Sequence, residues 1–308
     1  MSLCVVIFAF LCHNFRMDIS KASLRRFAQD LGLDDIRFAG AQDFEKAIPG
    51  GIVSPSALVQ DARCIVVLFK AYLPAGSAPQ GRMTLSSYYV ASHAAYTAAK
   101  KLESHLREQG ADAVQTSDLP SRAAALRTGG MIGGNHFYFH PQFGSFVCIK
   151  TVVTNAVEPD TPSDEQPQVC MHCDTCKRGC PSNAVDNLQN CLRNHIFDLI
   201  QEHIRGDVYQ LIGCEKCQSA CPLNPAEKSS PHAYPLGELL CGQHLSELKD
   251  LAGANIIRKN RVLSQASLYA ANTGAAHLAD LLEQIAQTSP PPTDAHARWA
   301  LGRLKERM

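Results

Sequence analysis

The sequence of 308 residues lacks an excess of charge of either sign, since 29 basic residues balance 29 acidic ones. A strongly basic balance is the electrostatic mark of many nucleic-acid-binding proteins, and this chain does not carry it. Overall neutrality still leaves room for a local basic face. The charge balance therefore neither predicts nor excludes a nucleic-acid partner.

Long apolar runs are also scarce, and the run at the N-terminus, Leu3 to Cys12, has only ten residues. A helix needs about 20 apolar residues to cross a bilayer, and a secretory signal carries a positive charge before its apolar stretch. A second methionine, Met17, precedes an ordinary domain sequence. We expect residues 1–16 to be a non-native or disordered extension of a cytoplasmic protein without a membrane partner. A membrane-touching segment is the alternative.

Cysteine, in contrast, is abundant, and eight of the thirteen cysteines fall between Cys170 and Cys221. The first run is Cys170-x-x-Cys173-x-x-Cys176-x-x-x-Cys180-Pro181, and the second, after a lone Cys191, is Cys214-x-x-Cys217-x-x-x-Cys221-Pro222. Such spacing is typical of two 4Fe-4S clusters, where the fourth cysteine of a run binds the other cluster. The sequence predicts one cluster on Cys170, Cys173, Cys176 and Cys221, and a second on Cys180, Cys191, Cys214 and Cys217.

Zinc and disulfides are the alternatives for these cysteines. Zinc accepts Cys-x-x-Cys pairs, but a four-ligand site built from two pairs leaves the third cysteine and the Cys-Pro ending unexplained. Disulfides need an oxidising compartment, and thirteen is an odd count. The other five cysteines stand singly in apolar surroundings, where a thiol behaves as a small apolar group: Cys4, Cys12, Cys64, Cys148 and Cys241.

The length favours two or three domains. Apolar patterns predict a helix from about Leu24 to Leu31 capped by Asp18 or Ser20, and buried strands at 64–69 and 145–154. They also predict helices at 88–109 and 121–128. The proline- and acid-rich segment 157–168 reads as a linker. We expect an α/β domain at 17–157 and a two-cluster ferredoxin-like domain at 158–230.

Beyond Pro222 the pattern predicts helices only, at 236–251, 258–271, 275–286 and 294–305. The last two are similar to one stacked helical repeat, which cannot bury its apolar face alone. We therefore expect the tail at 231–308 to be a short HEAT-like repeat that packs onto the preceding domain. The fold class predicted for the whole chain is α+β.

Several motifs outside the cysteine runs resemble epoxyqueuosine reductase, a cobalamin-dependent family that completes queuosine on tRNA. The resemblance covers most of Ile19 to Leu304. It is carried by Asp118-Leu119-Pro120-Ser121-Arg122-Ala123-Ala124-Ala125, Gly130-Met131-Ile132-Gly133-Gly134-Asn135, Gly144-Ser145-Phe146, and Asn260-Arg261 leading to Ala271-Asn272-Thr273-Gly274.

The resemblance implies that electrons pass through the two clusters to a corrinoid, whose reduced cobalt removes the epoxide oxygen. Asp118 matches the position of the acid that supplies a proton in the family. A carboxyl group donates at neutral pH only if burial raises its pKa, so Asp118 is expected in a dry pocket. The alternative is that Asp118 caps the helix beginning at Ser121.

The same resemblance implies corrinoid contacts at Gly130, Gly133, Asn135 and Ser145. The sequence departs from the family at Met131, Gly134 and Lys150, which fall on the surfaces expected to face cofactor and substrate. Two other functions therefore stay open: a ferredoxin-like electron carrier without a corrinoid, and a corrinoid reductase of a small molecule.

Transfer RNA and an external electron donor are the partners that the resemblance implies. Cations that could lie beside RNA phosphates occur at two places in the tail. The alternative is that they are solvated helix ends, where cations complement the helix dipole. They are Arg258, Lys259 and Arg261 at the start of one expected helix, and Arg303, Lys305 and Arg307 at the end of the last.

Overall fold

The computed structural model describes residues 19–42, 44, 53–161 and 170–307. The expected extension at 1–16 and most of the expected linker therefore lie outside the described residues. The chain forms two compact units, each built from separate stretches. Of the described residues, unit 1 takes 19–42, 44, 53–69, 96–128 and 149–161, and unit 2 takes 70–95, 129–148 and 170–307. The domain boundaries expected from the sequence stay a prediction.

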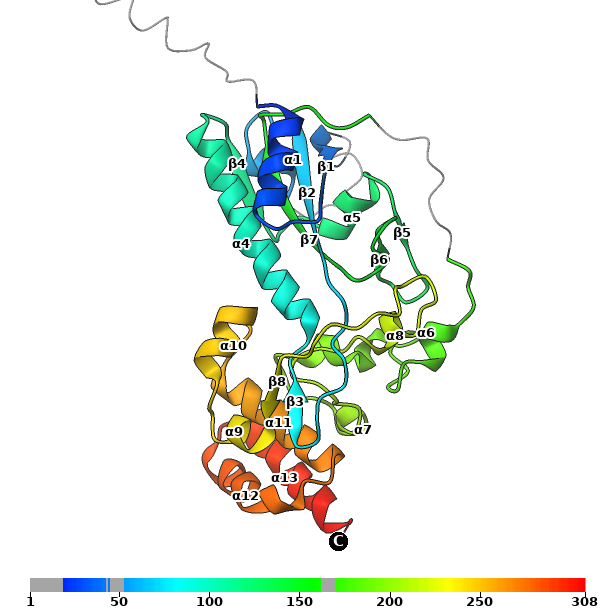
Figure 1. Ribbon diagram of the computed structural model, residues 1–308, viewed down its shortest axis with the longest axis vertical. Coiled ribbons are helices and arrows are strands. Elements are labelled where there is room, and N and C mark those ends of the chain that lie inside the picture. Colours follow the sequence, from blue (N-terminus) through cyan, green and yellow to red (C-terminus); the bar gives the residue numbers. More distant parts are fainter. Residues whose placement is uncertain (1–18, 43, 45–52, 162–169, 308) are drawn as a thin grey trace, which may run out of the picture. The chain divides into compact units, whose positions relative to one another are not determined.

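Unit 1 is organised around a four-stranded sheet in the order β1-β2-β7-β4 (Figure 1). The strands are β1 (Asp35–Gly40), β2 (Cys64–Ala71), β4 (Ala113–Thr116) and β7 (Val147–Thr154). β1 is antiparallel to β2, with Asp35 opposite Phe69, and β4 is antiparallel to β7, with Ala113 opposite Thr154. The first six residues of β2 are all buried, as its continuous apolar run predicts. Both strands predicted from apolar runs are confirmed.

Three described helices of the first half follow the predicted ranges, and a fourth, of four residues, was not predicted. They are α1 (Lys21–Asp30), α3 (Pro55–Leu58), α4 (Ser87–Glu108) and α5 (Ser121–Leu126), and α4 runs from unit 2 into unit 1. The Ser20 hydroxyl accepts from the backbone N–H of Ser23 and caps α1, because the first N–H groups of a helix have no partner within it. Leu24 of α1 and Leu102 and Leu106 of α4 are fully buried.

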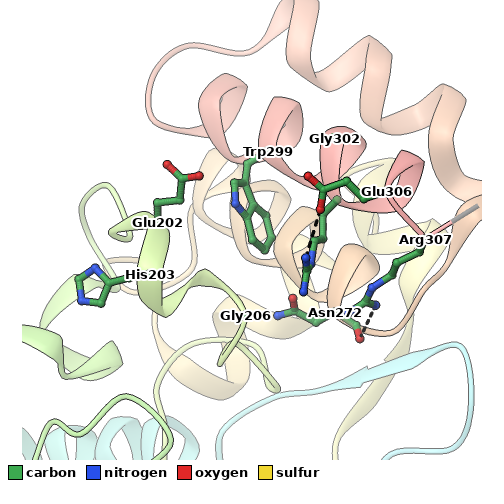
Figure 2. A pocket seen from close by; sticks show the side chains of 9 residues that line it. Glu202, His203, Gly206, Asn272, Trp299, Gly302, Glu306 and Arg307 are labelled. Atoms are coloured by element: carbon green, nitrogen blue, oxygen red, sulfur yellow. Dashed lines mark hydrogen bonds and ion pairs between the residues drawn. The ribbon is translucent and has the colours of Figure 1, made fainter.

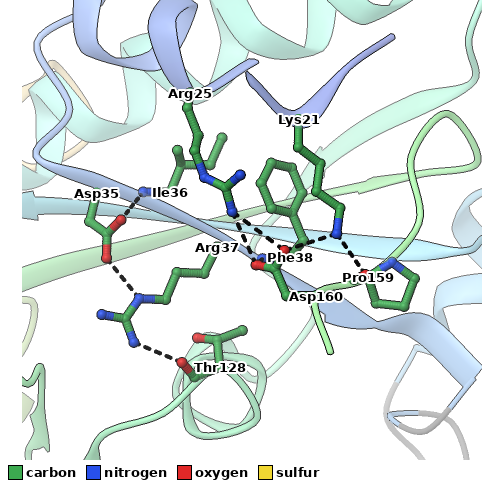
Figure 3. Close-up of polar contacts among 9 residues, drawn as sticks. All are labelled: Lys21, Arg25, Asp35, Ile36, Arg37, Phe38, Thr128, Pro159 and Asp160. Atoms are coloured by element: carbon green, nitrogen blue, oxygen red, sulfur yellow. Dashed lines mark hydrogen bonds and ion pairs between the residues drawn. The ribbon is translucent and has the colours of Figure 1, made fainter. Parts of the chain in front are cut away.

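A polar network fastens α1 and β1 to the segment after β7 (Figure 3). Lys21 Nζ donates to Asp160 Oδ1 at 2.9 Å and to the carbonyl of Pro159 at 2.7 Å. Asp160 Oδ2 accepts from the backbone N–H of Phe38 at 3.2 Å. Because one carboxylate serves both a helix and a strand, the return of the chain after β7 is fixed within unit 1.

Unit 2 contains the cysteine runs and the helical tail. Its strands pair as β3 (Arg82–Thr84) with β8 (Ala233–Pro235), and β5 (Met131–Ile132) with β6 (Tyr138–Phe139). Its helices are α6 (Thr175–Arg178), α7 (Glu202–Arg205), α8 (Lys216–Ser219), α9 (Leu236–Leu240), α10 (Leu245–Ala252), α11 (Lys259–Asn272), α12 (Ala279–Thr288) and α13 (Thr293–Lys305). Three short 3-10 turns complete it: η1 (Leu188–Asn190), η2 (Leu192–His195) and η3 (Ala276–Leu278).

Two predictions for the tail are wrong. The single helix predicted at 236–251 is two helices, because Gly242 at φ +75° and His244 at φ +62° break the ladder between α9 and α10. The prediction of helices only after Pro222 misses β8. This strand has three residues and pairs with a strand far upstream, so it leaves no local periodicity to read.

The apolar core of unit 2 joins both ends of its sequence. Met83 in β3 and Leu85 just after it are fully buried in one cluster with residues of the tail helices such as Leu239, Val262 and Ala297. The tail therefore shares its core with the residues around β3. Among the described residues, no helix is both long and apolar enough to cross a bilayer.

Candidate functional site

The first set of cysteines lines one cavity in unit 2. Cys170, Cys173, Cys176 and Cys221 all face a space of about 260 Å³. The rest of its wall comes from the residues flanking these cysteines and from the β5–β6 hairpin, through Gly133, Gly134, Asn135 and Phe139. The first three cysteines of the first run and the distant Cys221 therefore lie around the same space.

Local backbone geometry explains how the first run curls around this space. His172 and Asp174, between the cysteines, have φ of +49° and +55°, a conformation that residues other than glycine rarely adopt. Helix α6 then carries Cys176 and is followed by Gly179. A Cβ on Gly179 would lie 2.5 Å from Cβ of Ala220, so only glycine allows α6 and α8 to approach this closely.

The thiols of the first set differ in their ease of ionisation. Cys173 is exposed, and the hydrogen bond with the Thr175 hydroxyl at 3.2 Å lowers the pKa of its thiol. Burial raises the pKa of the Cys221 thiol, and the thiolates of Cys176, Cys170 and Cys173 raise it further. Cys221 is thus close enough to the first run to interact with it.

The second set is more enclosed. Burial raises the pKa of Cys214 to about 11 and that of Cys217 to about 12, and Cys180 and Cys191 add to both shifts. The four thiols are thus close enough to act on one another, and their assignment to one cluster stays a prediction. Because ligating thiols must lose their protons, filling such a site releases protons and becomes easier as pH rises.

Within the described residues, no three or more His, Cys, Asp or Glu side chains are arranged to hold a single metal ion. A 4Fe-4S cube makes a different demand, because its four thiolates bind different corners of one cluster. The donor set here is four cysteines in each group, which is the ligand set of such clusters.

The glycines predicted to contact a corrinoid pack against their own hairpin. A Cβ on Gly130, which has φ +92°, would lie 2.5 Å from the Phe139 carbonyl oxygen. A Cβ on Gly133 would lie 2.4 Å from the Phe139 ring. Both glycines are therefore explained by the closeness of β6.

The two polar residues predicted beside them also have places in unit 2. The buried Asn135 lines the cavity of the first set; its Oδ1 accepts from the Phe137 backbone N–H at 3.3 Å, and its Nδ2 has no partner among the described residues. Ser145 Oγ accepts from Asn224 Nδ2 at 2.8 Å and from Gln218 Nε2 at 3.2 Å. Sequence reasoning missed Gln218 and Asn224, although they stand one residue after Cys217 and three after Cys221.

Asp118 lies in unit 1, in the turn before α5. The expectation that it sits in a dry pocket is wrong for this structure, where the residue is exposed. Its backbone N–H donates to Thr116 Oγ1 at 2.9 Å, which shapes the turn. In this part of the described chain, Pro120 holds the cap position of α5 and no side chain caps the helix, so the capping alternative is not seen either.

The cations of the tail fall into two places. A cavity of about 500 Å³ lies between α7, the end of α11 and α13, with Trp299 in its wall (Figure 2). There Arg303 pairs with Glu306 at 3.1 Å, and Arg307 donates to the carbonyl of Ala271 at 2.8 Å. The two arginines predicted at the chain end are therefore already engaged within the protein.

The second place is a groove of about 310 Å³ that includes Arg258, Lys259, Arg261 and Phe197. Phe197 is 54% exposed, and the Arg261 guanidinium lies 4.2 Å from its ring centroid. Arg258 and Lys259 form no ion pair with any residue of the described ranges. An exposed aromatic ring beside unpaired cations is a combination that binds single-stranded nucleic acid.

Comparison with known proteins gives a consistent result, although no family model matches the chain. A Bacillus subtilis (strain 168) protein named epoxyqueuosine reductase is 28% identical over 218 residues, which are 62% of this chain and 55% of that protein. A Bacillus anthracis protein of the same name is 24% identical, over 92% of this chain and 89% of that one. The aligned part thus spans about half of the first relative and most of the second.

Solved structures share the fold. Epoxyqueuosine reductase from Bacillus subtilis matches with a TM-score of 0.73 at 24% identity, over 92% of this chain and 90% of that one. The enzyme from Streptococcus thermophilus matches with the same TM-score at 21% identity, over 94% and 91%. The fold and the two cysteine sets define a cysteine-rich protein of mixed helix and sheet. More particularly, its named relatives are epoxyqueuosine reductases, and the resemblance read from the sequence is confirmed.

Proposed function

We propose that the protein is a cytosolic oxidoreductase that reduces the epoxide of epoxyqueuosine in tRNA with electrons carried by two 4Fe-4S clusters. The observation that carries the proposal is the grouping of eight cysteines into two sets of four neighbours. The likeness to named epoxyqueuosine reductases supports the choice of substrate. Removing an epoxide oxygen as water consumes two electrons and two protons, so an external donor must reload the clusters.

Besides its four cysteines, the first set has hydrogen-bond donors close to them. The backbone N–H of Gly134 donates to Cys170 Sγ at 3.4 Å, and Asn135, whose buried Nδ2 has no partner among the described residues, lines the same cavity. A buried amide without a partner costs about 1–3 kcal/mol, which a sulfur acceptor of a bound cluster would offset. Hydrogen bonds to sulfur are also a means by which proteins set cluster potentials.

Replacing single cysteines tests the two sets. Anaerobically reconstituted protein should contain about eight irons, because each cube holds four. Cys221→Ser should remove the cluster built on the first run, whereas Cys191→Ser should remove the other, leaving about four irons in each case. Cys241→Ser, outside both sets, is the matched control and should keep all of the iron. Stoichiometric zinc in place of iron would overturn the proposal.

A corrinoid is part of this proposal only through the family resemblance. Of the four residues predicted to contact it, Gly130, Gly133 and Ser145 are accounted for by contacts within unit 2, and Asn135 lines the cavity of the first cysteine set, so we derive no step through it. This engagement also favours the second candidate function, an electron carrier without a corrinoid. The visible spectrum after saturation with cobalamin distinguishes them, since the carrier should retain both clusters and bind no corrinoid.

Asp118 remains our proposed proton donor. Donation at neutral pH requires a less exposed setting than the one in this structure, so the turn before α5 must close over substrate. One solved structure of the Bacillus subtilis enzyme is described with its catalytic aspartate loop swung out of the active site, which supports a loop that moves.

Asp118→Asn tests this role. The variant should keep its iron and bind RNA as the wild type does, with turnover lowered by about 100-fold or more, because an amide cannot replace a general acid. Glu108→Gln, an exposed change at the end of α4, should leave turnover unaltered. Normal turnover of Asp118→Asn would remove Asp118 from the mechanism.

A further inference from the structure

Arg193 stands out in unit 2 because its charge lies among aromatic rings. It belongs to η2 and follows Cys191 by two residues. Its guanidinium carbon is 3.8 Å from the ring centroid of Tyr88 and 5.1 Å from that of Phe137. The side chain keeps some exposed surface, yet its charged end is covered by these rings.

The hydrogen bonding of Arg193 places it beside the second set of cysteines. Its Nη1 donates to Gln218 Oε1 at 3.2 Å, and Gln218 directly follows Cys217. Gln218 is itself almost fully buried and donates to the Ser145 carbonyl at 2.7 Å. This chain of bonds holds the guanidinium near Cys217, where its charge lowers the thiol pKa that burial raises.

No carboxylate among the described residues forms an ion pair with Arg193. The nearby buried Glu215 accepts from Ser86 Oγ at 2.8 Å and from the backbone N–H of Tyr88 at 3.1 Å instead. The first set differs, because its neighbour Lys177 pairs with Asp186 at 2.8 Å. Lys177 beside the first set is therefore held in an ion pair, whereas Arg193 beside the second set has no ion-pair partner in the described ranges. Burial lowers the Arg193 pKa, and the charge of Glu215 raises it without a direct contact.

A charge taken out of water without a partner is strongly unfavourable. A cube held by four thiolates is an anion, and it gains one further negative charge when it accepts an electron. We propose that Arg193 is a positioning residue that compensates this charge and gives the cluster on Cys180, Cys191, Cys214 and Cys217 the higher potential of the two. The inference rests on the proposed pair of clusters.

The redox step itself is simple. A one-electron reductant, dithionite in the assay, is oxidised as the cluster gains its electron, and no proton is transferred because Arg193 stays charged in both states. Electrons then collect on the second cluster. The reduced state is the one that the guanidinium stabilises more, because the attraction grows with the negative charge.

Redox titration of the reconstituted full chain, followed by electron paramagnetic resonance, tests the inference. Arg193→Gln should make reduction of one cluster at least tenfold less favourable, a fall of 59 mV for one electron, with the other cluster unchanged. Arg193→Lys keeps the charge and should stay near the wild type. Lys177→Gln, which removes a cation already paired, is the matched control and should shift its cluster less.

The outcomes distinguish failure of the proposed role of Arg193 from failure of the proposed pair of clusters. Wild-type protein without iron would refute the clusters themselves. Iron in full amount with unchanged potentials in Arg193→Gln, or an equal fall in Arg193→Lys, would refute the role of charge.

If Arg193→Gln loses iron, retention of iron by Arg193→Lys supports the role and loss in both variants refutes it. Arg193→His adds an internal test, because its potential should fall as pH rises through the histidine pKa, whereas the wild type should show no such pH dependence.

Discussion

The amide of Asn135 has one end engaged in a turn and the other without a partner. Its Oδ1 accepts from the Phe137 backbone N–H, and its buried Nδ2 has no partner among the described residues, in a side chain that lines the cavity of the first cysteine set. Asn135→Asp keeps the acceptor and removes the donor. We expect the potential of the first cluster to fall by about 60 mV or more, the one-electron equivalent of a tenfold change.

Asn187→Asp is a matched control for this prediction. Asn187 Oδ1 accepts from the Gln189 backbone N–H at 3.2 Å in a similar turn, but its side chain is exposed and lies outside the cavity. The same change there should leave both potentials within error. Equal shifts in the two variants would mean that the added charge, and not the lost hydrogen bond, is responsible.

For single residues, the sequence was informative where the interacting residues are close together along the chain. Cysteine spacing led us to expect Cys170, Cys173, Cys176 and Cys221 around one space, where they lie, because a cluster loop fixes the interval between its ligands. The assignment of ligands to two clusters stays a prediction. The partners of Ser145 were beyond reach, since Gln218 and Asn224 stand 73 and 79 residues away along the chain. The covering of the Arg193 guanidinium by aromatic rings likewise cannot be predicted from sequence, because Tyr88 and Phe137 are distant along the chain.

Helix α13 carries a histidine whose environment makes the tail sensitive to acid. His296 is fully buried, its Nε2 accepts from the Ile200 backbone N–H at 3.1 Å, and its Nδ1 meets the Ser264 hydroxyl. Burial lowers its pKa to about 4. The unfolded chain therefore takes up a proton below about pH 6.5 that the folded chain refuses, and stability is lost as pH falls from there towards 4.

Urea unfolding followed by Trp299 fluorescence measures this loss. Between pH 7.5 and 5.5 the free energy of unfolding should fall by about 1 kcal/mol through His296, because one pKa unit corresponds to about 1.4 kcal/mol. His296→Gln should remove that part of the pH dependence. His277→Gln, at an exposed position of the same tail, should leave it intact.

Helices and strands with a long, unbroken apolar pattern were predictable from the sequence. Very short strands and breaks within a helical pattern were not. Strands β2 and β7 follow from unbroken apolar runs, and α1 from a serine cap and an amphipathic face. The break between α9 and α10 depends on residues in the left-handed region, which helix periodicity does not register. Hairpin β5–β6 has two residues in each strand, too few for any alternation.

For the whole molecule, the net charge of zero neither predicts nor excludes RNA binding, so this property has to be tested. The groove with Phe197 holds the unpaired cations Arg258 and Lys259. Arg258→Ala and Lys259→Ala should each weaken binding of an epoxyqueuosine-containing anticodon stem-loop and lower the salt slope by about one, because each removes one phosphate contact.

Arg307→Ala is the control, since its guanidinium is held by the Ala271 carbonyl, and it should change affinity less. Gel shifts over a series of salt concentrations give both quantities. Absence of binding at any salt, with both clusters present, would point to a small-molecule substrate.

The pairing of β3 with β8 can form only after a long stretch of the chain between them has been synthesised. Arg82 donates to the carbonyl of Ala233, 151 residues later in the chain. A ribosome adding about 5–20 residues per second needs roughly eight to thirty seconds to supply that partner. For this interval Met83 and Leu85 lack the part of their core that β8 and the tail helices provide. The space lined by Cys170 and Cys221 likewise cannot close before Cys221 has been synthesised.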